Sequence, residues 1–133
     1  MNRNLYVLDG HEPRRARSVL EWMQWFANAD RTIALTSIDD IEVSTVFLGI
    51  EHEYSPHGHL RGQPVLFETA IFETSKVVRV FRYRTWDEAA RAHAFIVECL
   101  QDAIHKRRLD PNQAIEEAQQ RWLKRGVNEH GNA

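Results

Sequence analysis

Three polar residues could carry chemistry in this chain, because each stands in otherwise apolar surroundings. His93 lies at the centre of an apolar helical stripe, Glu68 interrupts the apolar run LFETAI, and His52 ends the apolar run before it. A buried imidazole needs partners for its N–H and its lone pair, and a buried carboxylate is normally paired. These residues are therefore the first candidates for a polar network or a site.

Two interpretations of this group differ in class. A His–Glu–His set can bind Zn²⁺ or another divalent metal, and a small hydrolase would use His52 and His93 as ligands and Glu68 as ligand or general base. The same residues could instead form a hydrogen-bonded network that fixes a helix on a sheet, without any cofactor. Side chains alternate between the faces of a strand, so a register shift of one residue would separate His52 from Glu68. Both interpretations stay open.

The segment at residues 51–63, EHEYSPHGHLRGQ, is the longest irregular stretch and is rich in loop formers. Loops of this length between strands are more often functional than short turns. Its candidate contact or weak metal-binding residues are Glu51, Glu53, His57 and His59. A polar surface loop is the simpler interpretation.

The run VVRVFRYR at residues 77–84 interleaves cations with aromatic rings. Such a strand could stack on nucleic-acid bases, with Arg79, Arg82 and Arg84 as contacts. The net charge of −2 argues against nucleic acid, and aromatic residues on a strand beneath a helix are usually core. Nucleic-acid binding is therefore the weakest of the alternatives.

The first of the elements that must position these residues is a helix predicted from Pro13 to about Ala29. Proline suits a first helical turn, and the spacing of Val19, Trp22, Met23 and Phe26 places them on one face. Three arginines, at positions 14, 15 and 17, would then crowd its first turn, where the helix dipole disfavours cations.

Four strands are predicted next, at residues 32–37, 41–50, 64–72 and 77–84. Their succession predicts an antiparallel meander, with the strand at 41–50 inside the sheet because its second half is apolar on both faces. Gly49 in that strand predicts a bulge or a close backbone approach. The short run at residues 4–8 is an edge strand or an ordered arm.

Two helices complete the chain. A capping box of Thr85 and Glu88 opens the first, and Asp110, Pro111 and Gln113 open the second. The second is expected to end at Gly126, and residues 127–133 to form a frayed tail. The prediction is one α+β domain over residues 1–133, in two layers: a four-stranded antiparallel meander with an N-terminal helix and two C-terminal helices.

The composition limits the kinds of protein that this chain could be. The chain has 133 residues, of which 43% are hydrophobic and 27% charged, as is ordinary for a globular protein. Cys99 is the only cysteine, which excludes an internal disulfide and is compatible with a reducing cytoplasm. No run is apolar enough for a signal peptide or a membrane span, so we expect a cytoplasmic location and no membrane partner.

Three segments, VSTVFLGIEH (43–52), PVLFETAIF (64–72) and RYRTWDEAARAH (82–93), together resemble a family of small uncharacterised proteins of bacteriophages and prophages. The N-terminal YVLDGHEP, followed by a tryptophan-rich helix and ADR, is similar too. The resemblance covers roughly residues 5–95, and its motif positions match His52, Glu68 and His93. It implies a phage-type protein but no particular activity.

The function expected from these features is a non-enzymatic interaction protein that acts in the host cytoplasm. Its surface would comprise the 51–63 segment and the flanking helices. Trp22, Trp25 and Trp122 lie on terminal helices, which favours a protein partner or a homodimer. No glycine-rich phosphate loop or nucleophile elbow is present in the sequence.

Overall fold

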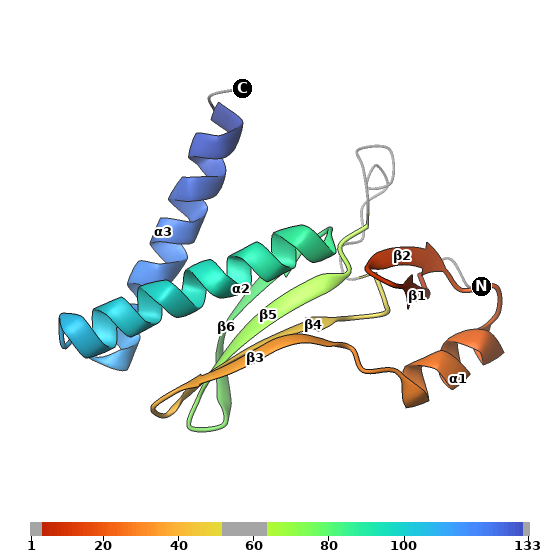
Figure 1. Ribbon diagram of the computed structural model, residues 1–133, viewed down its shortest axis with the longest axis horizontal. Coiled ribbons are helices and arrows are strands. Elements are labelled where there is room, and N and C mark those ends of the chain that lie inside the picture. Colours follow the sequence, from red (N-terminus) through yellow and green to blue (C-terminus); the bar gives the residue numbers. More distant parts are fainter. Residues whose placement is uncertain (1–3, 52–63, 132–133) are drawn as a thin grey trace.

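Four strands joined in succession form the sheet at the centre of the computed structural model (Figure 1). The structure describes residues 4–51 and 64–131, and their side chains as far as residue 125. The strands are β3 (Thr32–Ile38), β4 (Ile41–Phe47), β5 (Phe67–Glu73) and β6 (Lys76–Tyr83). Every strand pairs antiparallel with its neighbour in the chain, in the order β3-β4-β5-β6. The predicted meander, with the second strand inside it, is confirmed.

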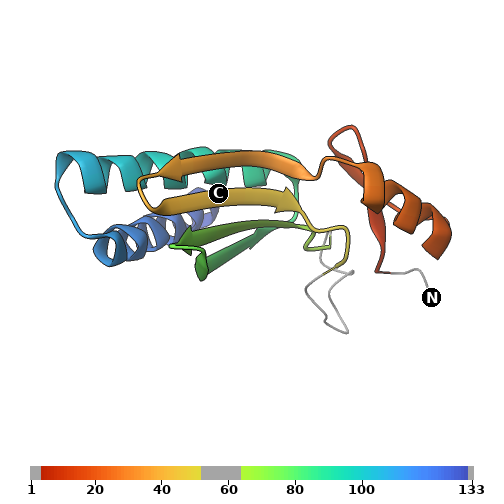
Figure 2. The ribbon, with the colours of Figure 1, turned by 90° about the horizontal axis from the view of Figure 1, so that it is seen from below.

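One face of this sheet forms the core and the other is open. Along β4 the alternate residues Ile41, Val43, Thr45 and Phe47 are buried, which is the period expected of a strand covered on one side. On the other face Leu35, Val77 and Val80 are 58%, 54% and 43% exposed. Figure 2 shows the strands in front of α2 and α3, so both helices lie on one side of the sheet. The two-layer α+β prediction is confirmed.

Helix α2 (Trp86–Gln101) covers the sheet and contacts all four of its strands. Its predicted capping box is present, because the Glu88 N–H donates to Thr85 Oγ1 at 3.1 Å. A π-type turn, η2 (Asp102–Lys106), ends the helix, and the Arg107 N–H donates to the Asp102 carbonyl five residues back.

Helix α3 (Pro111–Gly131) packs on α2 and over β6. Asp110 and Gln113 bond each other's N–H groups at 2.9 and 3.1 Å, as the predicted capping box requires. Trp122 fixes α3 in place by edge contact with Tyr83 and tilted contact with Phe95. The helix continues to Gly131, so the predicted end at Gly126 is wrong.

The N-terminal region differs most from its prediction. Strands β1 (Tyr6–Asp9) and β2 (Glu12–Arg15) form a hairpin, and α1 (Val19–Asn28) begins only after it. The predicted helix start at Pro13 is wrong because the true N-cap is Ser18, whose side chain accepts the Glu21 N–H. Arg14 therefore lies on a strand, where it forms an ion pair with Glu21 at 2.8 Å. Together with the Arg17 N–H, this contact lowers the pKa of Glu21 to about 2.

Contacts at the hairpin turn and at Gly49 help to attach this N-terminal unit to the rest of the chain. At the hairpin turn, the His11 ring stacks on Trp86 with 3.7 Å between ring centroids. At Gly49, the carbonyl accepts hydrogen bonds from the Tyr6 N–H and from Trp22 Nε1. Gly49 has φ +79°, a conformation that side chains disfavour, so the predicted close backbone approach is confirmed.

Candidate functional site

A line of polar side chains lies between α2 and the sheet, centred on His93. His93 Nε2 is 2.9 Å from Thr36 Oγ1 on β3, and its Nδ1 is 2.7 Å from Thr45 Oγ1 on β4. Thr45 Oγ1 is 2.6 Å from Thr69 Oγ1 on β5. Side chains from one helix and three strands thus form a continuous chain of hydrogen bonds. We call Thr36, His93, Thr45 and Thr69 the His93 network.

Burial of the network sets the charge of its histidine. His93 is 6% exposed, and Thr45 and Thr69 are fully buried. Desolvation lowers the pKa of His93, which favours the neutral ring. A neutral imidazole has one N–H and one lone pair, so if Nε2 donates to Thr36, Nδ1 must accept from Thr45. The direction of the threonine hydroxyls is therefore coupled to the histidine tautomer.

Tyr83 adds a buried hydroxyl on the same face. The residue is 3% exposed, and burial raises the pKa of its hydroxyl. Among the described residues, the hydroxyl oxygen has no hydrogen-bond partner of normal geometry, although the Thr69 side chain lies near enough to oppose the rise in its pKa. Its ring, in contrast, is well packed against Trp122.

Replacing Tyr83 by Phe is expected to leave the free energy of unfolding unchanged within about 0.5 kcal/mol, because no hydrogen bond is lost. Replacing Thr69 by Val is expected to cost about 1 to 2 kcal/mol, since Thr45 loses a buried partner. Urea denaturation of both variants measures the difference. Equal losses would show that the Tyr83 hydroxyl is bonded.

Of the predicted group of His52, Glu68 and His93, the structure separates Glu68 from His93. Glu68 pairs with Val46 across β4 and β5, while its neighbour Thr69 faces the helix. Successive side chains on a strand point to opposite faces, so Glu68 lies on the open face, away from His93. There its carboxylate bonds Arg82 Nε at 3.0 Å. His52 lies outside the described residues.

The metal interpretation has no geometric support in the part of the chain described. No group of three or more His, Cys, Asp or Glu side chains within it could hold a metal ion. Of the candidate loop contacts, Glu53, His57 and His59 lie outside the described residues. Glu51 is half-buried, and its N–H donates to the Asn4 carbonyl.

The arginine-rich strand does not form a stacking surface. Phe81 and Tyr83 are 7% and 3% exposed and belong to the core, as the alternative interpretation predicted. Arg79 donates to Gln119 and Glu116 of α3, and Arg82 is paired with Glu68 on the opposite face. Arg84 is half-buried at the start of α2. The rings needed for base stacking are therefore inaccessible.

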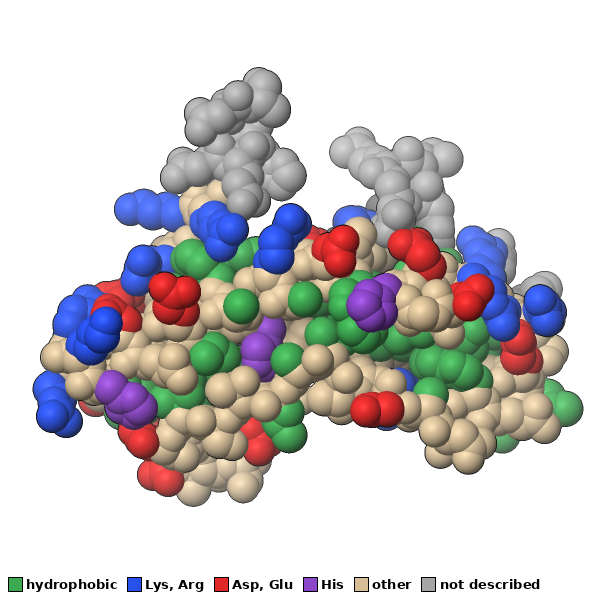
Figure 3. All heavy atoms as spheres, viewed as in Figure 1, with side chains coloured by type: hydrophobic (Ala, Val, Ile, Leu, Met, Phe, Trp, Pro, Cys, Tyr) green, Lys and Arg blue, Asp and Glu red, His purple; other side chains and the backbone are tan. Residues whose placement is uncertain are grey.

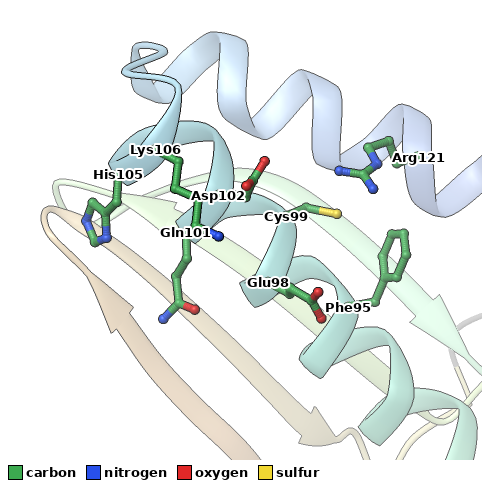
Figure 4. Close-up of a pocket in the computed structure, with 8 residues that line it drawn as sticks. All are labelled: Phe95, Glu98, Cys99, Gln101, Asp102, His105, Lys106 and Arg121. Carbon is green, nitrogen blue, oxygen red and sulfur yellow. The ribbon is translucent and has the colours of Figure 1, made fainter.

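Cys99 lines a hollow of about 500 Å³ beside the C-terminal half of α2 (Figure 4). The lining comes from α2, η2 and α3: Phe95, Glu98, Cys99, Gln101, Asp102, His105, Lys106 and Arg121. Burial raises the pKa of the Cys99 thiol, so the nucleophilic thiolate is disfavoured. This environment is that of a buried, unreactive thiol.

One face of α1 is exposed, contrary to its prediction. Val19 and Met23 were predicted to face inward with Trp22 and Phe26, but they are 46% and 55% exposed. Leu20 beside them is 63% exposed, and no residue of α1 is fully buried. We call Val19, Leu20 and Met23 the α1 patch. The width of the apolar arc on this short helix was the signal that could have identified it.

An α+β two-layer domain with a buried histidine–threonine network is the class of protein that these observations define. Comparison with protein-family models, with curated proteins and with solved structures found no match. No helix in the described segments combines the length and apolar character that crossing a membrane requires.

Proposed function

We propose that this chain is a phage- or prophage-type protein that acts in the host cytoplasm as a non-enzymatic interaction protein. The resemblance of its three motif segments to phage proteins supports the origin. The α1 patch supports the activity, and it replaces the tryptophans as the contact surface. Trp22, Trp25 and Trp122 are half-buried in contacts within the chain.

The apolar arc on α1 is wider than the part of the helix that contacts the rest of the chain. At 100° per residue, the apolar side chains of this helix span about 220°. Trp25, Trp22 and Phe26 occupy roughly 100° of that arc and face the rest of the chain: Trp25 contacts Phe47, and Trp22 bonds Gly49. A second arc of similar width, which holds the α1 patch, is left exposed.

The proposed partner is a protein with an apolar surface that accepts one helix face. Gln24, the polar residue next to the α1 patch around the helix, carries no charge, and Glu21 farther round is paired with Arg14. An uncharged, apolar helix face of this size matches the helix-in-groove mode of recognition. Helix α1 follows a hairpin anchored at Trp86, and Figure 1 shows that the helix lies at the end of the molecule away from α3.

A photo-crosslinking amino acid at Leu20, expressed in host cells, is expected to capture a defined protein. The same amino acid at Gln113, an exposed position on α3, serves as control and is expected to capture nothing at that mass. Adding Met23→Asp to the protein that carries the crosslinker at Leu20 is expected to abolish the crosslinked product, because it places a charge in an apolar contact. Identical products from both positions, or none from Leu20, would contradict the proposal.

A further inference from the structure

The two edges of the central sheet differ in their protection against strand pairing. At one edge, β6 has three cations, Lys76, Arg79 and Arg82, and an irregularity in its pairing with β5. At the other edge, β3 reads TIALTSI, without charge, proline or glycine. Edge strands are normally blunted by Lys, Pro or bulges, and a flat uncharged edge is a template for another strand. No described strand pairs with the outer side of β3.

The backbone groups at this edge are arranged for pairing. A two-residue turn joins Ile38 to Ile41, which makes them a hydrogen-bonded pair, and such pairs alternate along antiparallel strands. The N–H and C=O groups of Leu35 and Ser37 are therefore directed away from β4. The irregularity in the β3–β4 pairing lies between Thr32 and Ala34, so residues 34–38 remain regular.

We propose that β3 pairs antiparallel with β3 of a second copy of this chain, about a twofold axis at Leu35, so that two sheets join into one of eight strands. The two Leu35 residues would then exchange two backbone hydrogen bonds. Their half-exposed side chains would lie side by side on the open face.

The position of α2 fits this arrangement. His93 bonds Thr36 on β3 and Thr45 on β4, so at this point α2 lies above the space between those strands. The twofold axis would lie half a strand spacing outside β3, whereas α2 lies half a spacing inside it. With strands about 4.8 Å apart, the α2 axis would be about 5 Å from the twofold axis, and the two α2 helices about 10 Å from each other. This separation matches the roughly 8 to 10 Å of packed helices.

The side of α2 that would meet its copy has small, uncharged side chains next to the sheet, while the exposed Asp87 and Glu98 lie farther round the helix from the sheet. Its Ala92 and Cys99 side is buried toward α3, whereas Ala90, Ala94 and Val97 lie on the β3 side and are at least partly exposed. Small side chains at this position permit close approach of two helices. Figure 3, which looks onto this side of the molecule, shows mostly hydrophobic and uncharged atoms between α2 and β3. Charged side chains lie mostly along the upper rim and the ends, with several acidic side chains also along the lower edge.

Sedimentation equilibrium of the full chain, over a range of concentrations, tests this proposal. We expect the parent protein to sediment at twice the mass of the chain. Leu35→Pro removes the outward N–H without removing a β4 hydrogen bond, and it is expected to raise the dissociation constant roughly 100-fold. Ala94→Glu brings two like charges together at the axis and is expected to raise the constant roughly tenfold, at an exposed site that does not threaten folding.

Val80→Lys is the matched control, on the same open face but at the β6 edge, and it is expected to leave the dimer intact. A parent protein that stays monomeric at all concentrations would overturn the proposal. The proposal would also be overturned if Leu35→Pro and Ala94→Glu both formed dimers with the dissociation constant of the parent protein. Met23→Asp in the α1 patch is expected to leave the sedimenting mass of the dimer unchanged. Dimer formation through β3 and partner binding through the α1 patch can therefore be tested separately.

Discussion

His93→Ala is expected to lower the free energy of unfolding by about 2 to 4 kcal/mol, one of the two largest losses we predict. The substitution leaves a void under α2 and removes the buried partner of Thr45. Urea denaturation followed by circular dichroism measures the loss. His105→Ala is the control, because His105 is exposed and bonds only Asp39 among the described residues, at 3.2 Å. Its loss is expected to stay within about 0.5 kcal/mol. Equal losses would contradict the structural role of His93.

The pH dependence of stability provides an independent check on the same residue. Burial holds the pKa of His93 in the folded state below its usual value near 6.5. Between the two values the unfolded state binds more protons, so stability is complete above about pH 6.5 and falls as the pH drops toward the folded pKa. His93→Ala is expected to lack this slope. Glu21, whose pKa is lowered to about 2, loses its contribution in a lower range, below its ordinary value of 4.5.

Gly49→Ala is expected to cost about 2 to 3 kcal/mol and to release α1 from the body of the molecule. A Cβ at this position would lie 2.9 Å from Phe26 Cε1 and 3.3 Å from Trp22 Nε1. The alanine would also have to adopt φ +79°, a left-handed conformation that residues other than glycine disfavour. Urea denaturation measures the loss. Hydrogen exchange is expected to show lost protection in α1 and retained protection in α2.

Gly10→Ala separates the two causes of this loss. Gly10 has φ +64°, but a Cβ there would meet nothing within 4 Å. Its replacement is therefore expected to cost only about 1 kcal/mol of backbone strain. If both variants lose the same free energy, the packing of Trp22 and Phe26 on Gly49 contributes nothing.

The sheet and its covering helices could be predicted because their signals are local. Capping boxes at Thr85 and Asp110 marked both C-terminal helices. The apolar second half of 41–50 placed that strand inside the sheet, although β4 itself ends at Phe47. Each signal reports on residues that are neighbours in the chain. The role of His93 as a buried, bonded residue also followed from its place on one helical stripe.

The rest of the candidate site depends on pairing between distant segments. The face on which Glu68 lies follows from its register against Val46, which changes with a single residue of shift. The threonine partners of His93 come from three strands, and no local pattern distinguishes them from other strand threonines. At the N-terminus, Pro13 suited a helix start equally well, but pairing with β1 placed it on a strand.

The order of elements along the chain also has a consequence for folding during synthesis. The last strand, β6, ends at Tyr83, so all four strands can leave the ribosome before α2 does. Until α2 follows, the face that holds Val43 and Ile71, both fully buried in the finished protein, has no cover. At about 5 to 20 residues per second, the residues from Trp86 to Gln101 add roughly one to three seconds. During that interval the nascent sheet has an apolar face and an unprotected β3 edge, and the emergence of α2 ends the exposure of that face.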